Sequence, residues 1–277
     1  MRDYRKEVIL ANVALGEMLA KNYKKNEPHY SKENIEIVDA KLQRLKDLTK
    51  GESLLDLGCG TGFIIDIAKK YFDTIRGVDV SSSMLQQVDV PEGDISLEIC
   101  AADKMPFRDE AFDVVTAYAL LHHLDSIEAT LREAFRVLKP GGVFYSALDP
   151  NYYFLQDLDS LRDVGIYSEV VRREKDKWLC EVDNRTHADA EPLKYEGLGF
   201  REETLKQVLQ DVGFHDHRID YYWLPGEGPL AKGDIQTRMH RDIIVAFVKN
   251  LLPLSRNIFK YIEITAMKPK VQGGRNV

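Results

Sequence analysis

The chain has 277 residues, of which 44% are hydrophobic and 30% charged, a composition typical of a globular protein with room for one large core. Its formal net charge of −7 argues against a nucleic-acid partner. The charged first residues lead into no signal-peptide core, and no apolar run approaches the length of a membrane span. Cys59, Cys100 and Cys180 show no C-x-x-C spacing and fit a reducing compartment. From these features together we expect a cytoplasmic protein without a membrane partner.

The first fifty residues predict two amphipathic helices. Residues 4–22 place one set of side chains on a single helical face: Val8, Ile9, Asn12, Leu15, Met18 and Leu19. After a polar break, Ser31 is the predicted N-cap of a second helix that ends at Gly51. Three aromatic residues lie in or beside the break and could either close over a ligand or only pack the hinge: Tyr23, His29 and Tyr30.

Residues 54–63 change from an apolar run to three glycines at alternate positions, Gly58, Gly60 and Gly62, and then to helical periodicity. This order predicts a strand, a tight turn and a helix whose first N–H groups face a polar or anionic ligand. The spacing differs from the dinucleotide fingerprint G-x-G-x-x-G, and by itself it could mark a purely structural turn.

A second short strand, residues 75–79, ends in Asp79. A carboxylate at the end of the second strand of a βαβ unit is suited to bond the hydroxyls of a ribose. Together with the glycine turn, Asp79 favours a cofactor that contains a nucleoside.

Strands and helices alternate from 51 to 148, which predicts an α/β fold with a parallel sheet between helices. The strands are expected at 53–57, 75–79, 95–100, 112–118 and 142–148, and the helices at 61–72, 81–89 and 126–138. Asp125 and Glu128 stand in capping-box register for the last of these helices. Pro140, Gly141 and Gly142 are expected to end it and turn the chain into the fifth strand.

With these motifs, the chain resembles the class I S-adenosylmethionine-dependent methyltransferases. The resemblance covers about 50 to 150 and rests on segments that follow one another in the family's order: 54–63, 78–81, 102–107, 112–115 with 121–124, and 131–142. It is closest to the small-molecule branch, which includes quinone-ring C-methyltransferases and carrier-protein-acyl O-methyltransferases. It implies a Rossmann-like sheet of seven strands with helices on both faces, an N-terminal helical lid and inserted cap segments.

The resemblance also implies how the chain is divided. We expect an N-terminal helical lid at 1–50, a cofactor-binding core at 51–149, an inserted acceptor cap at 150–200, a return to the core at 201–222, a second helical insertion at 223–257, and the seventh strand with the tail at 258–277.

The cofactor implied is S-adenosyl-L-methionine, converted to S-adenosyl-L-homocysteine. Its expected contacts lie at the turn and at the carboxyl ends of the strands: Asp56, Gly58, Gly60, Thr61, Gly62, Asp79, Val80, Met84, Ala102, Asp103 and Ala119. Asp56 would contact the amino-acid end, Asp79 the ribose and Asp103 the adenine amino group, while Val80 and Met84 would sandwich the ring. As alternatives, Asp56 and Asp103 could be loop or cap acids, and Met84 could be a core residue.

Two adjacent histidines, His122 and His123, follow the fourth strand and raise the question of a metal site or a general base. Adjacent side chains are expected to point in different directions, and no third ligand is spaced to join them, so we expect no metal. The resemblance implies a structural or cofactor-side role for at least one of them.

Methyl transfer depends mainly on positioning and on a dry pocket, so we assign no single base. The candidates for contact with the reacting atoms are His123, Tyr23, His29 and Tyr118, and further aromatic residues could face the acceptor: Tyr152, Tyr153 and Trp223.

After residue 150 the pattern is less regular. A helix is expected at 155–177, a short strand at 178–182, a helix at 202–212 and a strand that ends near Tyr222. The insertion at 223–257 predicts a helix with an apolar stripe that covers an acceptor cavity or a dimer face, with lipid contact as the alternative: Ile235, Met239, Ile243, Phe247 and Leu251. A last strand at 258–267, antiparallel to the others, is expected to close the sheet.

The function expected is methylation of an O, N or C nucleophile of a small molecule, by a chain that could form a homodimer through its inserted helices. Two alternatives stay open: a methyltransferase acting on protein or RNA, and a cofactor-binding interaction module without turnover. Residues 117–120 lack the Asn-Pro-Pro-Tyr run with which similar enzymes present a planar amine, which argues against base amino groups as acceptors.

Overall fold

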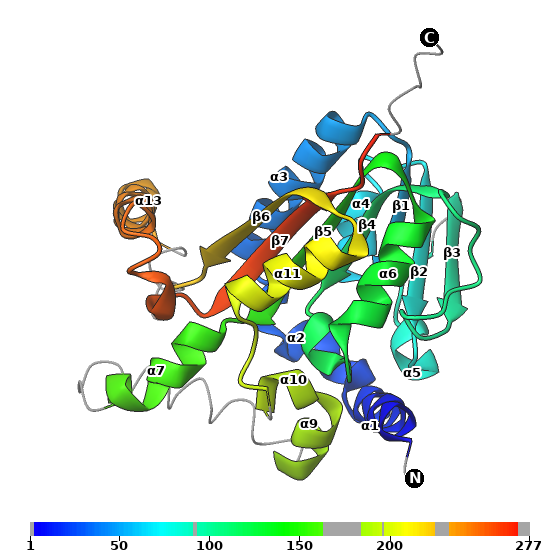
Figure 1. Ribbon diagram of the computed structural model, residues 1–277, viewed down its shortest axis with the longest axis horizontal. Helices are drawn as coiled ribbons and strands as arrows, with labels where there is room; N and C mark the ends of the chain where they lie inside the picture. Colours follow the sequence, from blue (N-terminus) through cyan, green and yellow to red (C-terminus); the bar gives the residue numbers. More distant parts are fainter. Residues whose placement is uncertain (1–2, 91–92, 163–183, 196, 225–232, 271–277) are drawn as a thin grey trace.

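The computed structural model describes residues 3–90, 93–162, 184–195, 197–224 and 233–270. These residues build one seven-stranded sheet in the order β3-β2-β1-β4-β5-β7-β6 (Figure 1). The strands are β1 (Ser53–Leu57), β2 (Thr74–Asp79), β3 (Asp94–Ile99), β4 (Phe112–Tyr118), β5 (Leu138–Pro150), β6 (His215–Tyr222) and β7 (Tyr261–Met267). β1 to β5 pair in parallel, whereas β7 is antiparallel to both β5 and β6. The predicted α/β sheet with an antiparallel last strand is therefore confirmed.

Helices cover both faces of the sheet, as Figure 1 shows. They are α1 (Tyr4–Leu19), α2 (Tyr23–Asn26), α3 (Lys32–Thr49), α4 (Phe63–Ala68), α5 (Ser82–Leu85), α6 (Ile127–Val137), α7 (Tyr152–Arg162), α9 (Asn184–Ala190), α10 (Pro192–Tyr195), α11 (Glu202–Val212) and α13 (Ile235–Lys249). The described residues also form short 3₁₀ turns: η1 (Ala20–Asn22), η2 (Pro28–Tyr30), η3 (Leu121–His123) and η4 (Arg256–Ile258).

The alternation of side chains along each strand divides the core into two layers. Leu54 of β1 belongs to the layer that α3 and α4 cover, where Leu42 and Ile64 are buried. The next residue, Leu55, belongs to the opposite layer, under Leu131 of α6 and the apolar stripe of α11. The central strands are apolar on both faces because helices cover both.

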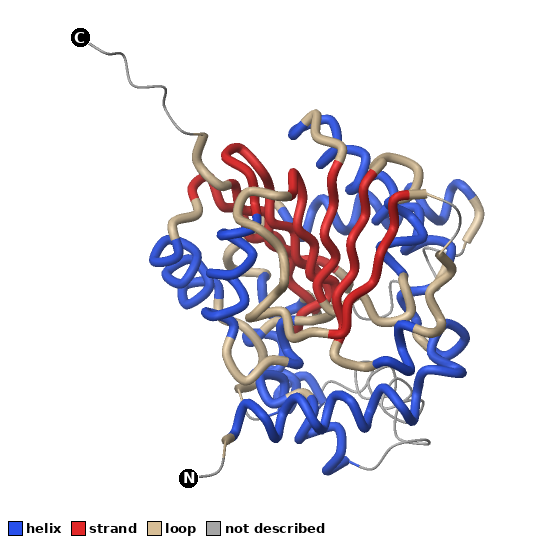
Figure 2. Tube along the Cα trace, turned by 90° about the vertical axis from the view of Figure 1, so that its right-hand side faces the viewer, coloured by secondary structure: helices blue, strands red, loops and turns tan. Residues whose placement is uncertain are grey.

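α1, α2, α9 and α10 lie across one end of the sheet, whereas α3 runs along one of its faces (Figure 1 and Figure 2). α1 packs against α9, and α10 packs against η3. Ser31 caps α3 as predicted, because its hydroxyl accepts a hydrogen bond from the N–H of Asn34 at 3.3 Å. The contacts of α1 with α9 and of α10 with η3 hold these helices at the end of the sheet where β1, β2 and β4 terminate.

Several predicted helix boundaries are wrong. The helix expected at 61–72 is only α4, because the chain leaves it through tight turns such as that from the Tyr71 N–H to the Ala68 carbonyl. α5 is likewise shorter than the predicted 81–89. Asp125 does not cap α6: Ser126 occupies the N-cap position without a side-chain bond, and Glu128 pairs with Arg132 instead.

The end of α6 also differs from its prediction. Residues 140–142 do not separate helix from strand, because β5 begins directly at Leu138, which pairs with Phe112. The register then shifts, and Val143 pairs with Val114. Gly141 and Gly142 thus lie in an irregular part of β5, where the chain adjusts its pairing with β4.

The segments after β5 follow the prediction only in part. α7 begins at Tyr152, earlier than expected, and both the rest of the helix expected to 177 and the strand expected at 178–182 lie outside the described residues. α13 lies within the predicted second insertion, but it projects from the edge of the sheet and has no buried residue (Figure 1). No described helix combines the length and the hydrophobicity that crossing a membrane would need.

Candidate active site

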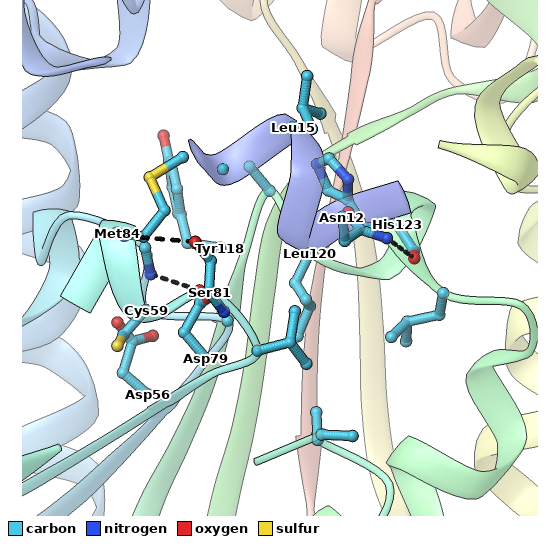
Figure 3. Close-up of a pocket in the computed structure, with 18 of the residues that line it drawn as sticks. Asn12, Leu15, Asp56, Cys59, Asp79, Ser81, Met84, Tyr118, Leu120 and His123 are labelled. Carbon is cyan, nitrogen blue, oxygen red and sulfur yellow. Dashed lines mark hydrogen bonds between the residues drawn. The ribbon is translucent and has the colours of Figure 1, made fainter. Parts of the chain in front are cut away.

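A cavity opens where the carboxyl ends of β1, β2 and β4 meet, with α1 across it (Figure 3). The empty space in this cavity, including the part that is open to solvent, is about 1190 Å³. In Figure 3, Asp56 and Asp79 lie at the lower left of this cavity, and Asn12 and His123 lie at its upper right. Open α/β sheets place their ligand sites at this end of the strands.

Most of the residues predicted to bind a cofactor line this cavity: Asp56, Gly58, Gly60, Thr61, Asp79, Val80, Met84, Ala102, Asp103 and Ala119. Gly62 is the exception, and its predicted contact finds no support. It precedes α4 with a φ of 89°, and a Cβ there would lie 2.9 Å from a methyl carbon of Val88. Gly62 therefore serves the turn and its packing rather than the cavity.

The turn after β1 needs glycine at Gly58 for two reasons. Its φ of 59° is in the left-handed region, and a Cβ would lie 2.5 Å from Cδ1 of Leu120. Gly60 also has a positive φ, and its N–H donates to Oδ2 of Asp79 at 2.8 Å. The other carboxylate oxygen of Asp79 accepts from the N–H of Ser81, also at 2.8 Å. The glycine turn and the acid of β2 thus hold each other in place.

Burial raises the pKa of two carboxyl groups in the cavity, Asp56 and Asp79. Asp56 is 2% exposed, and burial raises its pKa to about 8, although the hydroxyl of Thr116 donates to it at 2.8 Å. Burial also raises the pKa of Asp79, against the opposing effect of its backbone hydrogen bonds. The folded protein therefore disfavours the ionised form of both acids unless a cation or further hydrogen-bond donors bind beside them.

Asp103 is already paired. Arg5 of α1 donates from Nε to Oδ2 at 2.5 Å and from Nη2 to Oδ1 at 2.6 Å. This bidentate bond holds the pKa of Asp103 below its usual value. Arg5 was not among the predicted site residues, because no local pattern connects it with an acid 98 positions away.

Aromatic side chains gather at the end of the cavity beside Asp56 and Thr61: Tyr23, His29, Tyr30, Phe63 and Tyr118. Neighbouring ring centroids are 4.8 Å apart for His29 and Tyr30 and 5.0 Å apart for both His29–Phe63 and Phe63–Tyr118. The hydroxyl of Tyr30 bonds that of Thr61 at 2.6 Å. Three of the catalytic candidates, Tyr23, His29 and Tyr118, therefore belong to one aromatic cluster.

The other aromatic candidates lie outside the cavity lining. The guanidinium of Arg201 lies 3.8 Å from the ring centre of Tyr152, and that of Arg256 lies 3.4 Å from that of Tyr153. Trp223 packs edge-on against Tyr261. α13 does not reach the cavity either, since Ile243 and Phe247 are 62% and 65% exposed. The expectation that this helix covers an acceptor cavity is therefore wrong.

α1 contributes a wall of the cavity that its amphipathic pattern predicts only in part. Of the predicted apolar face, Val8, Ile9, Asn12, Leu15 and Leu19 line the cavity, whereas Met18 is exposed. The amide of Asn12 donates to the backbone carbonyls of Val8 and His123, both at 3.0 Å. In the sequence, this contact is indicated by Asn12, a polar residue within the apolar stripe of the helix.

The histidine pair differs from its prediction. The two rings lie side by side, with centroids 4.4 Å apart and planes inclined by 36°. Nδ1 of His122 is 2.8 Å from Oδ1 of Asp149, and Nδ1 of His123 is 3.1 Å from the carbonyl of Ala190. These partners turn both rings the same way, so the expectation that the side chains diverge is wrong. Burial lowers the pKa of His123 to about 3, so this imidazole is neutral.

Comparison with known proteins agrees with this geometry. Residues 55–146 match the family described as "Methyltransferase domain". The chain is 31% identical over 193 residues to the ubiquinone/menaquinone biosynthesis C-methyltransferase UbiE of Vibrio parahaemolyticus, a match that covers 64% of this chain and 68% of that protein. The chain belongs to the class I S-adenosylmethionine-dependent methyltransferases.

Two further relatives of this methyltransferase illustrate the range of the family. It is 34% identical over 110 residues to the ubiquinone biosynthesis O-methyltransferase of Pseudomonas fluorescens, which covers 36% of this chain and 46% of that protein. The structure of phosphoethanolamine N-methyltransferase 2 of Haemonchus contortus, in complex with phosphomonomethylethanolamine and S-adenosylhomocysteine, is similar with a TM-score of 0.59 at 16% identity. That match covers 98% of this chain but only 61% of the other, and it shows likeness of fold alone.

The cavity of the methyltransferase fits the family's cofactor. Its walls combine buried carboxylates, aromatic rings and the backbone of the glycine turn. The hydroxyl of Thr130, also on the wall, is buried without a hydrogen-bond partner among the described residues. Such an orphaned group is expected where a ligand supplies the missing bond.

Proposed function

We propose that this methyltransferase transfers a methyl group from S-adenosyl-L-methionine to an O, N or C atom of a small, ring-shaped molecule without a phosphate group. One observation carries the choice of acceptor. Arg5 is the only lysine or arginine among the described residues of the cavity lining, and it is bonded to Asp103. A phosphorylated or nucleic-acid acceptor would find no free cation there, whereas aromatic side chains suit an uncharged ring.

The relatives support the same class of acceptor. By name, one is a C-methyltransferase and another an O-methyltransferase of quinone biosynthesis. Both names concern ring compounds, and both differ from the phosphobase bound in the similar solved structure. We therefore favour a hydroxylated quinone-type ring over a phosphobase.

We assign the cofactor contacts from the geometry of the cavity wall. Each oxygen of Asp79 accepts one backbone N–H and keeps a lone pair for a ribose hydroxyl. Val80 and Met84, which line the cavity, would sandwich the adenine ring, with Ala102 and Asp103 at its edge. Asp56 lies beside the aromatic cluster and would attract the positively charged end. When bound, the cofactor supplies a methyl group activated by its sulfonium.

The chain's own contribution is to position the reactants and to exclude water. The faces of Tyr30 and Tyr118 can hold a cationic centre by cation–π contact, worth about 2 kcal/mol when desolvated. His123 presents a neutral imidazole that can accept a hydrogen bond from an acceptor hydroxyl. Correct alignment alone can lower a barrier by roughly 7–11 kcal/mol, so no single base is assigned.

We also propose roles for the segments around the core. α1 acts as the lid, since its apolar face lines the cavity. Within 150–200, the described residues act on the cavity indirectly, because α9 packs on α1 and Ala190 orients His123. The exposed apolar residues of α13 form the surface through which we expect a homodimer to assemble.

Calorimetry tests the cofactor site. We expect saturable binding of S-adenosyl-L-methionine and of S-adenosyl-L-homocysteine to the wild-type protein. Asp79→Ala should weaken both by roughly 100-fold or more, since two hydrogen bonds to a carboxylate are lost at about 1.5–3 kcal/mol each. Asp211→Ala, which alters an exposed acid at the end of α11, should bind as the wild type does. Binding of NAD in place of S-adenosyl-L-methionine would overturn the assignment.

Labelled cofactor tests the acceptor class. The protein is incubated with S-adenosyl-L-methionine labelled in its methyl group and, separately, with hydroxylated quinones, phosphoethanolamine, RNA and bulk protein. We expect label only in the quinone pool. Label in RNA or protein, or in phosphoethanolamine alone, would contradict the proposal. Absence of transfer to any pool would favour the non-catalytic interaction module.

A further inference from the structure

Three potential metal ligands from distant parts of the chain meet beside the cavity. His122 and His123 belong to η3, after β4, and Glu191 lies between α9 and α10. One ligand atom from each of the three lies within 4.8 Å of the other two. His122 and Glu191 are 7% and 4% exposed, while His123 lines the cavity wall.

Nδ1 of each imidazole has the kind of partner that the outer nitrogen of a metal-binding histidine usually has. Asp149 accepts the backbone N–H of His122 at 3.2 Å and bonds Nδ1 of the same residue at 2.8 Å. Because a carbonyl oxygen can only accept, Nδ1 of His123 must donate to Ala190, which leaves Nε2 with its lone pair. Histidines that bind metals usually donate their other N–H to a carboxylate or a carbonyl in this way.

Glu191 adds an anionic ligand. Its Oε2 accepts from the ammonium of Lys194, and its Oε1 is 3.5 Å from Nδ1 of His187, longer than the roughly 2.7–3.2 Å of a typical N–H···O bond. A carboxylate oxygen has two lone pairs, so Oε1 keeps one for a cation. Glu191 and Asp149 thus bring two carboxyl groups to the two histidines. A bound cation stabilises a buried carboxylate.

We propose that His122, His123 and Glu191 bind one divalent transition-metal ion, with an open coordination position toward the cavity. Two imidazole nitrogens and one carboxylate are the protein ligands of many catalytic zinc sites and of non-haem iron sites, whereas Mg²⁺ and Ca²⁺ prefer oxygen ligands. With bonds of about 2.1 Å, tetrahedral ligands are about 3.4 Å apart, so binding draws the three groups inward by roughly 1 Å.

The open position lies on the side of His123 that faces the cavity. An oxygen of the methyl acceptor would complete the coordination there, in place of the direct hydrogen bond to His123 that the metal-free protein offers. This last step rests on the proposed small-molecule acceptor, whereas the binding of the metal does not. The two can therefore be tested separately.

Metal binding is measured on chelator-treated full-length protein by calorimetric titration with Zn²⁺. We expect one ion per chain with a dissociation constant in the micromolar range or tighter. His122→Ala and Glu191→Gln should each weaken binding at least about 10-fold. His240→Ala removes an exposed histidine of α13 and should bind Zn²⁺ as the wild type does. Because Glu191→Gln leaves Lys194 without its carboxylate, thermal unfolding checks that each variant is folded.

Co²⁺ gives a readout that needs no variant. Addition of one equivalent to the wild-type protein should produce the visible absorption of tetrahedral or five-coordinate cobalt, and Zn²⁺ should abolish it. The proposal is overturned if Zn²⁺ does not bind stoichiometrically, or if His122→Ala and Glu191→Gln bind like the wild type. Binding of S-adenosyl-L-methionine to the wild-type protein is measured in parallel. If the wild type binds S-adenosyl-L-methionine but not Zn²⁺, only the metal site is overturned. If the wild type does not bind S-adenosyl-L-methionine, the proposed cofactor site is overturned.

Discussion

At the level of single residues, the burial of an ionisable group in the cavity lowers the stability of the ligand-free protein. Asp56 is almost fully buried, and its one side-chain partner among the described residues is the hydroxyl of Thr116. Its pKa is raised from 3.8 to about 8, so the folded protein binds this proton more tightly than the unfolded chain does. The contribution to stability is fully present below about pH 4 and is lost as pH rises toward 8.

Asp56→Asn should therefore stabilise the ligand-free protein relative to the wild type, and increasingly so with rising pH. The gain grows between pH 4 and 8 by at most about 1.4 kcal/mol per pH unit, because the variant has no proton to lose. Thermal unfolding of both proteins at pH 5 and pH 8 measures it, and an equal difference at the two pH values would falsify the role assigned to burial. The same variant should bind S-adenosyl-L-methionine more weakly, because the attraction to its positive end is lost.

Many individual site residues were predictable from the sequence. Asp79 and Asp103 end or follow strands, and the end of a strand in an open parallel sheet has a known position. Arg5 and Glu191 were not predictable as contacts, because each acts on the site from a segment that only folding brings near.

Among the elements, α1 is the helix that lies across the cavity (Figure 3). It is held by packing against α9 and α5, by the bond between Arg5 and Asp103, and by the hydrogen bond from Asn12 to the carbonyl of His123. Arg5 is 41% exposed, so this pair is worth about 1 kcal/mol or less. We propose that α1 is a lid that opens by breaking these contacts while the sheet stays folded.

Arg5→Ala should increase the hydrogen exchange of amides in α1 by up to about 5-fold in the ligand-free protein, since the ion pair opposes local opening. Lys6→Ala, on the same helix, is the matched control and should leave exchange unchanged. Exchange in β1 should stay the same in both variants. If Arg5→Ala does not change the exchange of α1, the ion pair does not hold the lid.

The exposed face of α13 gives a second prediction for an element. Phe247→Ser should leave the melting temperature and the binding of S-adenosyl-L-methionine unchanged, because Phe247 is 65% exposed and far from the cavity lining. If the homodimer forms through this helix, the variant should sediment as a monomer at concentrations where the wild type is dimeric. A wild-type monomer, or a dimer that survives the substitution, would refute self-association through α13.

For the molecule as a whole, stability comes from the two apolar layers beside the sheet. Leu42 of α3 is fully buried in one of them, whereas Leu48 of the same helix is 54% exposed. Leu42→Ala should lower the free energy of unfolding by about 2–5 kcal/mol, through lost apolar contact and a cavity. Leu48→Ala should change it by less than about 0.5 kcal/mol. Equilibrium unfolding in urea measures both, and similar losses would contradict the layered packing.

Local patterns in the chain were enough to establish the order of the strands and helices in the core and the acids that end the strands. These features depend on periodicity and turn chemistry, which are written in neighbouring residues. Three-dimensional packing alone revealed that Arg5 bonds Asp103, that Glu191 joins the two histidines and that the apolar face of α13 is left uncovered. Such contacts depend on which distant segments pack together, and that is set by the whole core rather than by any one stretch of the chain.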